Sequence, residues 1–534
     1  MFEHSAAPRV FYVPPGADFP AAVIAGLATR LKAPDAWART HILCNAGRMV
    51  SRLREVLEEG PPRLLPRLSL ITDLKSLAPH LTSAPPVAGL RRQLDLARDL
   101  RAISGLAAPL DIARALAVLL DEMDGEGVPF ARLQDLDVSD QSGHWARALA
   151  IVQTAAAYKP GLGPEAVYRA QVLDLIDAWQ DAPPAHPVLV AGSTGSRGTT
   201  ARLMQAVARL PQGALILPGF DPNTPQNVWK ELWEKRHEDH PQFRYAALLH
   251  TLELDPKAIE PWAGSLTPNP ERADFLSLAL RPAPVTHHWR RDSPKAADLS
   301  RATDDITLVE AKDQRAEATA IALRLREAVE AGQRAALISP DRGLTRRVAA
   351  ALARWDLVPD DSAGVPLSLT PPGRLLSQIA RLGTQGVAAD TLIALLKHPL
   401  VSTGANRGEH LLKTRALELK LRRKGPPFPT PVDVATWAEE DPTRTSWGAW
   451  LGPLLAPNDA QTLPDHLAWL MHATETLCAG PEAPETTGAL WEEAPGRAAK
   501  ATLEAMTEVS APEDTLSAQD FTVLLGQTLA AESL

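Results

Sequence analysis

The stretch from Val188 to Asp221 limits what this chain can fold into more than any other part of the sequence. Residues 188–191 and 214–217 are short apolar runs bounded by turn residues, which is typical of strands buried on both faces of a sheet. Between them, apolar residues recur at helical spacing and predict a helix. A strand, a helix and a second strand in this order predict a βαβ unit, and therefore a parallel sheet with helices on its faces.

The loop after the first of these strands is rich in residues typical of phosphate-binding turns. In a P-loop, glycines let backbone N–H groups surround a phosphate, and a Lys followed by Ser or Thr completes the site. Here Thr199 stands at the Lys position and Ser193 at the position of the first Gly. A non-standard phosphate loop and a tight strand-to-helix turn are both open, and the missing Lys favours the turn. The candidate phosphate-loop residues are Gly192, Ser193, Gly195, Gly198, Thr199 and Thr200.

The composition is that of a globular chain, with 45% hydrophobic and 22% charged residues. A length of 534 residues predicts about three or four domains. The 55 Lys and Arg against 64 Asp and Glu do not favour a protein that coats nucleic acid by bulk charge, although a local basic groove remains compatible with DNA binding. Two cysteines, Cys44 and Cys478, cannot supply four thiolates to a zinc or iron–sulfur site. They suggest a reducing compartment. Without a signal-peptide pattern or a long apolar run, we expect a cytoplasmic protein that has no membrane partner.

Before the central stretch, alternating patterns predict strands at 11–13, 41–44 and 68–71 and helices at 19–31 and 48–57. A fold of P-loop descent would carry its phosphate loop after the first strand, and residues 14–18 there have no Lys or Thr. This segment therefore stays open only as an unusual phosphate site of a nucleotide hydrolase. Residues 90–179 have a helical pattern without a clear strand. The acidic run at 121–126 could hold a metal, but a solvated helix end capped by Gly125 is the favoured interpretation, and no metal ligands are assigned.

Beyond the central unit, a polar, Pro-bearing segment predicts an interdomain linker. A second α/β block follows, with strands expected at 306–309 and 335–338 and helices at 316–330 and 344–355. From Pro371 onward the pattern is helical.

The second block resembles the start of the second motor domain of UvrD-like, superfamily-1 helicases. The residues that carry this resemblance are Glu317-Ala318 to Ile321-Ala322 and Ala335 to Arg342. Over essentially its whole length the chain resembles the AddB subunits of AddAB helicase–nucleases, in the form found in alphaproteobacteria. The matching phrases are residues 188–218, 335–373 and 395–399.

The resemblance implies an α/β fold of tandem RecA-like domains, P-loop NTPase-like and of the UvrD type, each a parallel sheet with large helical insertions. The implied segments are 1–89, the first part of domain 1; 90–180, a helical insertion; 181–285, the rest of domain 1; 286–300, a linker; 301–375, the start of domain 2; and 376–534, a second helical insertion. AddB subunits end in a nuclease domain with metal-binding carboxylates and an iron–sulfur cluster. That segment is not found here, so we expect the chain to correspond to an N-terminal part of such a subunit.

The function that the resemblance implies is repair of DNA double-strand breaks. The chain would be a helicase-like scaffold and DNA-handling subunit that forms a heterodimer with an AddA-like, UvrD-type helicase–nuclease. Its nucleic-acid partners would be double-stranded DNA ends and single-stranded DNA. ATP and Mg²⁺ are expected in the motor subunit, whereas no catalytic residue and no cofactor are assigned to this chain. Two alternatives remain: a nucleotide hydrolase with a non-standard phosphate loop, and a helicase-binding interaction protein that does not touch DNA.

Candidate DNA contacts come from two basic clusters. A basic cluster can follow a phosphate backbone, and a solvated helix face is the alternative interpretation. The candidates are Arg346, Arg347, Arg415, Lys420, Arg422, Arg423 and Lys424.

Overall fold

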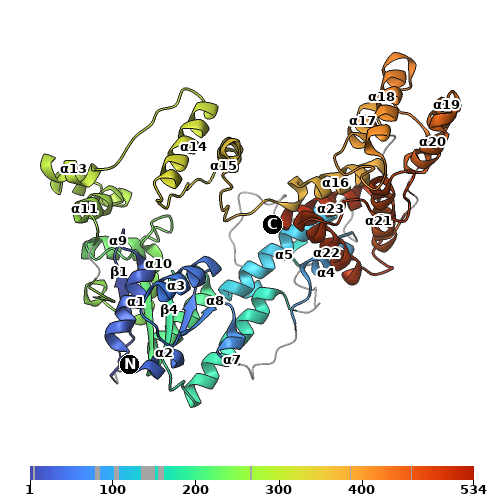
Figure 1. Cartoon of the computed structure of the whole chain (residues 1–534). Coiled ribbons are helices and arrows are strands. Elements are labelled where there is room, and N and C mark those ends of the chain that lie inside the picture. Colours follow the sequence, from blue (N-terminus) through green and yellow to red (C-terminus); the bar gives the residue numbers. More distant parts are fainter. Residues whose placement is uncertain are drawn as a thin grey trace. The chain divides into compact units, whose positions relative to one another are not determined.

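The computed structural model of the chain forms two compact units, which we describe separately (Figure 1). Unit 1 comprises Met1–Val87 and Ala115–Thr307, and unit 2 comprises Ala88–Arg114 and Leu308–Leu534. The structure describes residues 1–3, 7–78, 85–101, 108–133, 151–153, 162–264, 267–384, 387–456, 458 and 460–534.

Unit 1 is built on a parallel sheet of six strands in the order β3-β2-β4-β5-β1-β6. The pairing places Val190 beside Leu43 on one side and Leu215 on the other, so β4 lies inside the sheet. The predicted βαβ unit is confirmed as β4, helix α8 (Gly198–Arg209) and β5. The sheet makes unit 1 an α/β fold that is compatible with a Rossmann- or RecA-like core. The strands are β1 (Val10–Val13), β2 (His41–Cys44), β3 (Arg67–Leu70), β4 (Val188–Ala191), β5 (Gly213–Pro218) and β6 (Glu260–Pro261).

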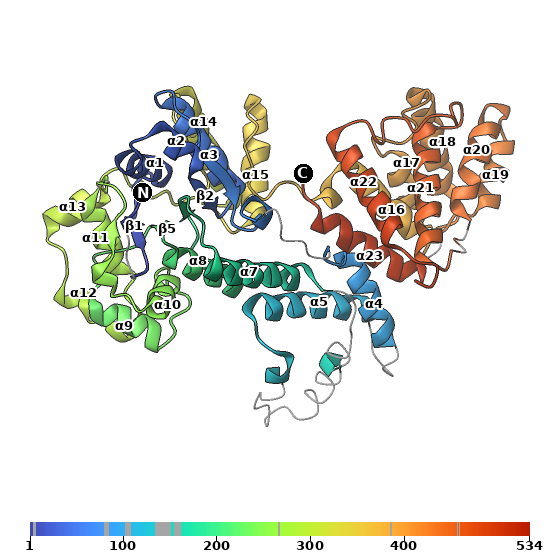
Figure 2. The same cartoon turned by 90° about the horizontal axis from the view of Figure 1, so that it is seen from below.

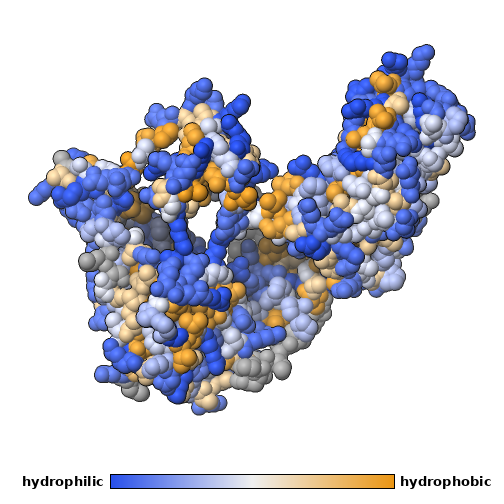
Figure 3. All heavy atoms as spheres, viewed as in Figure 1, coloured by the Kyte–Doolittle hydropathy of each residue, from blue (hydrophilic) through white to orange (hydrophobic). Residues whose placement is uncertain are grey.

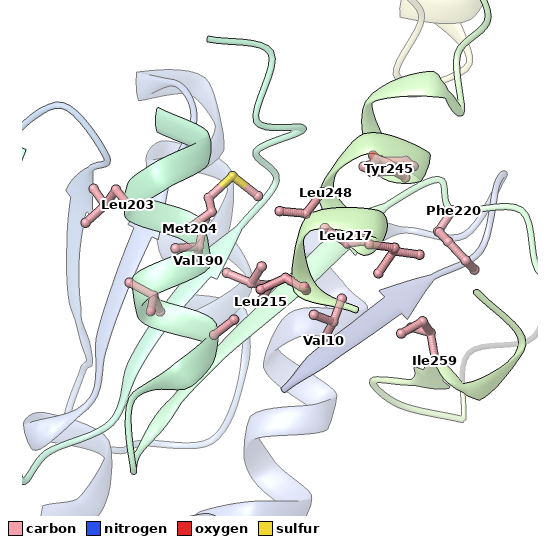
Figure 4. Close-up of a cluster of buried hydrophobic side chains, with 14 of the residues drawn as sticks. Val10, Val190, Leu203, Met204, Leu215, Leu217, Phe220, Tyr245, Leu248 and Ile259 are labelled. Atoms are coloured by element: carbon pink, nitrogen blue, oxygen red, sulfur yellow. The ribbon is translucent and has the colours of Figure 1, made fainter. Parts of the chain in front are cut away.

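Both faces of this sheet are buried, because successive side chains of a strand point to opposite faces. Val188 and Val190 belong to one core cluster, and Leu189 and Ala191 belong to the other. Figure 4 shows the first cluster, in which side chains of α8 and α10 meet those of β1, β4 and β5. The helices with residues in the first cluster are α7 (Pro164–Asp181), α8, α9 (Gln226–Glu234) and α10 (Phe243–Leu252). Those in the second are α1 (Phe19–Arg30), α2 (Pro34–Arg39) and α3 (Gly47–Glu59), and Figure 2 shows the sheet between the two helix layers.

The segment expected as a helical insertion of the first domain is divided between the two units. Helix α4 (Gly89–Arg101) belongs to unit 2, where the Arg91 guanidinium donates to the Asp514 carboxylate at 2.7 Å. Helix α5 (Pro109–Glu126) crosses the boundary between the units. It ends at Gly127, which has a φ of +69°, so this glycine rather than Gly125 occupies the left-handed position after the helix. The parts of the expected insertion at 102–107, 134–150 and 154–161 lie outside the described residues.

The expected linker at 286–300 is largely helical. It contains α12 (His288–Arg291) and the start of α13 (Ala296–Thr303), and α13 packs against α11 (Pro270–Ala279). The Arg272 guanidinium donates to the Ala302 carbonyl at 2.8 Å, which fastens α11 to α13. The polar composition of this segment therefore reflects a surface layer of unit 1.

The predicted strands at 306–309 and 335–338 are not formed. Two helices beside them, α14 (Gln314–Glu330) and α15 (Arg342–Leu352), form as predicted and share a small core. Leu337 packs against this core, whereas other apolar side chains of the two extended segments remain outside it, with Leu308 84% and Ile338 94% exposed. Figure 3 shows hydrophobic surface beside α14. A strand requires a neighbour for its backbone N–H and C=O groups, and no described residue pairs with these two segments.

The rest of unit 2 is helical, as predicted. Helix α16 packs against α21, α22 and α23, and side chains such as Leu375, Leu470 and Phe521 are fully buried between them. Within the part of the chain that the structure describes, no helix has both the length and the apolar character needed to cross a membrane. The helices are α16 (Pro371–Leu382), α17 (Ala389–Leu396), α18 (Arg407–Lys424), α19 (Pro431–Glu439), α20 (Thr445–Leu451), α21 (Leu463–Ala479), α22 (Ala494–Val509) and α23 (Ala518–Ala531).

A glycine in α1 is required by the packing of an indole. A Cβ atom at Gly26 would lie 2.2 Å from Nε1 of Trp262, which is 1% exposed and donates to the Val23 carbonyl at 3.0 Å. We expect Gly26→Ala to lower the free energy of unfolding by about 1–3 kcal/mol through overpacking, despite the better helix propensity of Ala. Gly47→Ala in α3 is the matched control, because nothing lies within 4 Å of its Cβ position. Equal thermal midpoints for the two variants would contradict this packing.

Buried His41 predicts a pH dependence of stability. Its Nε2 lies 2.7 Å from the Ser69 hydroxyl, and burial, with smaller effects of His186 and Arg67, lowers its pKa to about 4. The unfolded chain binds this proton near pH 6.5, so this contribution to stability is present above that pH and is lost as the pH falls toward 4. We expect His41→Gln to reduce the slope of unfolding free energy against pH in this window by up to about 1.4 kcal/mol per pH unit. Urea unfolding at several pH values measures the slope, and equal slopes for the variant and the parent would refute the assignment.

Candidate functional site

A crevice lies at the carboxyl ends of β2, β3 and β4. Strand β2 continues into α3 on one face of the sheet, and β4 continues into α8 on the other, so the two connections diverge. Parallel sheets bind ligands at such points, where neighbouring connections leave in opposite directions. The crevice has a volume of about 650 Å³. It is lined by Asn45, Ile71, Thr72, Pro86, Pro164, Glu165, Val167, Tyr168, Gln171, Gly192, Ser193, Thr194, Ser196, Arg197 and Thr200.

The loop after β4 forms one wall of the crevice, and it is the candidate phosphate loop of the sequence. Gly192 and Gly195 have φ values of +88° and +65°, a region that favours glycine. A Cβ at Gly192 would lie 2.9 Å from Oδ1 of Asn45, so the loop passes close to the end of β2. The Gly195 N–H donates to the Ser193 hydroxyl at 3.3 Å, which turns the chain toward α8.

A carboxylate of the chain itself occupies the N-terminus of α8. The Gly198 N–H donates to Oε1 of Glu126 at 2.9 Å, and the Thr199 hydroxyl donates to the Gly125 carbonyl at 2.8 Å. Free N–H groups and the helix dipole make such an N-terminus attractive to anions. Glu126 supplies a negative charge at this helix end, and a Cβ at Gly198 would approach Oε2 of this carboxylate to 2.7 Å.

The cation beside the loop is also paired. Arg197 donates from its guanidinium to Oε1 of Glu165 at 2.5 Å. The guanidinium is 68% exposed, so this ion pair contributes little to stability. Its positive charge is nevertheless balanced by Glu165, and Glu126 adds a negative charge at the adjacent helix end. These charges do not favour a polyphosphate in the crevice.

The other polar groups of the crevice are uncharged amides and hydroxyls, and an aromatic ring stands among them. The Tyr168 hydroxyl donates to the Ile71 carbonyl at 3.2 Å, at the end of β3. Burial raises the pKa of the Tyr168 phenol above its ordinary value, and a hydrogen bond with Thr200 partly opposes the rise. Asn45 and Thr72 lie at the ends of β2 and β3. A pocket of this kind suits a neutral, flat ligand that forms hydrogen bonds along one edge.

The turn between β1 and α1 also carries a carboxylate. Oδ1 of Asp18 accepts from the Ala21 N–H at 3.1 Å and caps α1, and Arg52 lies 3.9 Å from this carboxylate. Helices α1 and α8 each begin at a candidate phosphate position after an inner strand. The N-terminus of each of these helices is capped by an acidic side chain. Glu126 could not be recognised from the sequence, because it caps a helix that begins 72 residues later.

The candidate DNA contacts lie on two separate helices of unit 2. Arg346 and Arg347 are exposed on α15, and the Arg346 guanidinium donates to the Arg342 carbonyl at 3.1 Å. The other five are exposed on α18, and two of them are neutralised there. Lys420 pairs with Glu440 at 2.5 Å, and Arg422 pairs with Glu418 at 2.8 Å. Arg415, Arg423 and Lys424 form no ion pair with any described residue.

Metal ligands do not gather among the described residues, where no three or more His, Cys, Asp and Glu side chains are arranged to hold an ion. The thiols of Cys44 and Cys478 are both buried, and burial raises the pKa of each to about 12. No protein-family model matches the chain, and comparison with curated proteins finds no match.

The role of Glu126 as a helix cap can be tested by substitution. We expect Glu126→Gln to lower the free energy of unfolding by about 0.5 kcal/mol, because it keeps the acceptor for the Gly198 N–H but removes the charge at the helix N-terminus. The loss should shrink at high salt, since salt screens exposed charges. Glu122→Gln, an exposed change on the same helix, is the control and should have no effect. Equal unfolding midpoints for the two variants at low salt would show that the charge of Glu126 does not stabilise this helix end.

Proposed function

We propose that this chain is a helicase-like scaffold that handles DNA within an ATP-dependent helicase–nuclease complex. The complex would process double-strand ends for homologous recombination in the cytoplasm. The chain would form a heterodimer with a UvrD-type, AddA-like motor subunit, and that subunit would bind ATP and Mg²⁺. This proposal rests on the sequence resemblance to AddB subunits together with the chemistry of the crevice.

The single observation that carries the proposal is the pair of carboxylates at the two helix N-termini. Asp18 caps α1 and Glu126 caps α8, where an NTPase built on such a sheet would present free N–H groups to phosphate. A carboxylate in that position repels a triphosphate. The arrangement supports a motor-like fold that does not hydrolyse ATP, and it disfavours the alternative of a nucleotide hydrolase.

The crevice provides a chemical reason for contact with DNA. Its amide and hydroxyl groups match the hydrogen-bonding edge of a nucleobase, and the Tyr168 ring and neighbouring prolines supply apolar surface. Duplex DNA hides these base edges in the helix, whereas a single strand exposes them. We therefore assign the crevice to an unpaired base of the single strand that the complex produces.

A second motor-like domain is part of the same proposal. Helices α14 and α15 and the extended apolar segments beside them have the order strand, helix, strand, helix in sequence. We propose that they form the beginning of a RecA-like domain of the UvrD type, in tandem with unit 1. The exposure of Leu308 and Ile338 agrees with strands that have no sheet to join among the described residues.

Binding assays on the full chain test the proposal. We expect no ATP hydrolysis by the chain alone, and binding of a single-stranded DNA tail that becomes tighter when the UvrD-type motor is present. Asn45→Asp places a negative charge in the crevice and should weaken tail binding by about tenfold. Asn269→Asp adds the same charge outside the crevice while keeping the N-cap of α11, and should leave binding unchanged. Fluorescence anisotropy at fixed salt measures both effects.

Suppose that the isolated chain hydrolyses ATP and that Glu126→Lys changes the rate of hydrolysis. This result would overturn the proposal and favour a phosphate site at α8. Tail binding that is equal in the Asn45 and Asn269 variants would remove the crevice from the DNA path. Absence of DNA binding by both the chain and its complex with the motor would favour the interaction-protein alternative.

A further inference from the structure

The outer face of α18 carries an exposed row of leucine and arginine side chains. Leu412 is 65% exposed and Leu419 is 54% exposed. They are seven residues apart, about two turns of helix, so they lie on one side of α18. Arg415 lies three residues after Leu412, and Arg423 lies four residues after Leu419, so both fall on the same side of the helix, and both are exposed. We call these four residues the outer stripe.

The opposite face of α18 is held firmly by unit 2. His410, Thr414 and Leu417 are buried there. The indole N–H of Trp447 donates to Nδ1 of His410 at 3.1 Å, and Nε2 of the same ring lies 2.7 Å from the Leu396 carbonyl oxygen. With both ring nitrogens engaged, the helix cannot rotate to bury the outer stripe without breaking buried hydrogen bonds.

Charges beside the stripe are neutralised, whereas those on it are not. Lys413 pairs with Glu409 at 2.7 Å. Lys420 and Arg422, on the flanks, pair with Glu440 and Glu418 as described above. Neither arginine of the stripe forms an ion pair with a described residue. Unpaired positive charge is therefore concentrated between and beside the two exposed leucines.

We propose that the outer stripe is a docking surface for an acidic amphipathic helix of another protein. Apolar side chains seven residues apart pack against a matching row on a second helix, as in coiled coils. Arginine at the edge of such a row forms charge-assisted hydrogen bonds with Asp or Glu across the interface. The occupant is thus a helix with apolar residues at heptad spacing and with carboxylates beside them.

A protein fits the stripe better than nucleic acid does. DNA would contact the arginines, but it would leave Leu412 and Leu419 exposed or set them against phosphates. Three of the cations on the helix, Lys413, Lys420 and Arg422, are already paired with carboxylates of the chain, which lowers the attraction for a phosphate backbone. The leucines and the unpaired arginines together match a helix that is both apolar and acidic. This inference is independent of the crevice and of the proposed function in DNA handling.

The test uses the full chain and a synthetic peptide of about three heptads that has Leu at heptad spacing and Glu on both sides. Fluorescence anisotropy of the labelled peptide measures affinity. We expect Leu412→Ser/Leu419→Ser and Arg415→Glu/Arg423→Glu each to weaken binding by about tenfold or more. The leucine control is Leu323→Ser on α14, where the side chain is 50% exposed. The charge control is Arg346→Glu/Arg347→Glu on α15. Neither control should change the affinity.

A charge swap makes the test specific. A peptide with Lys in place of Glu should bind the Arg415→Glu/Arg423→Glu variant and not the parent chain. Circular dichroism of the variants checks that α18 remains folded. An absence of peptide binding to the folded parent chain would overturn the inference. So would binding of a single-stranded oligonucleotide that depends on Arg415 and Arg423 but not on the leucines, because the surface would then serve nucleic acid.

Discussion

Burial of a parallel sheet on both faces is the constraint on which unit 1 depends. Each inner strand must place apolar side chains on two opposite sides, so Val190 packs under α8 while its neighbour Leu189 packs under α1 and α3. The chain therefore has to cross the sheet on both faces. The connection after β2 passes to one face of the sheet and the connection after β4 passes to the other. The crevice lies between these two connections. The candidate site therefore follows from having helices on both faces of the sheet, because the two diverging connections leave a space at the carboxyl ends of the strands.

The chemistry of the crevice is set by a contact between distant parts of the chain. The turn from β4 into α8 has the positive-φ glycines and the free helix end of an anion site. Glu126 of α5 supplies the anion from within the protein, and Glu165 balances the charge of Arg197. These two carboxylates leave the turn without the positive electrostatic field that would hold a phosphate. The uncharged amide and hydroxyl groups of the pocket suit a neutral hydrogen-bonding ligand.

Unit 2 shows the opposite situation, apolar surface that the described chain does not cover. The extended segments around Leu308 and Ile338 have the composition of buried strands, but they have no neighbouring strand among the described residues, and both of these side chains are exposed. On α18 the exposed leucines are accompanied by arginines that form no ion pair with a described residue, so we expect the partner at this surface to be negatively charged.

The sequence by itself determined the α/β class of unit 1 and the places of β2, β4, β5 and α8, since apolar periodicity is a property of a few consecutive residues. It also identified α14 and α15 and the helical character of the chain from Pro371 onward. Only the tertiary structure decided whether an extended apolar segment becomes a strand, because a strand needs a hydrogen-bonding neighbour from elsewhere in the chain. Residues 306–309 and 335–338 have no such neighbour among the described residues. Tertiary structure likewise placed Glu126 at α8 and neutralised Lys420 with Glu440. These pairings join residues 72 and 20 positions apart, beyond the reach of a local pattern. They decide which charges remain free, and therefore what each surface can bind.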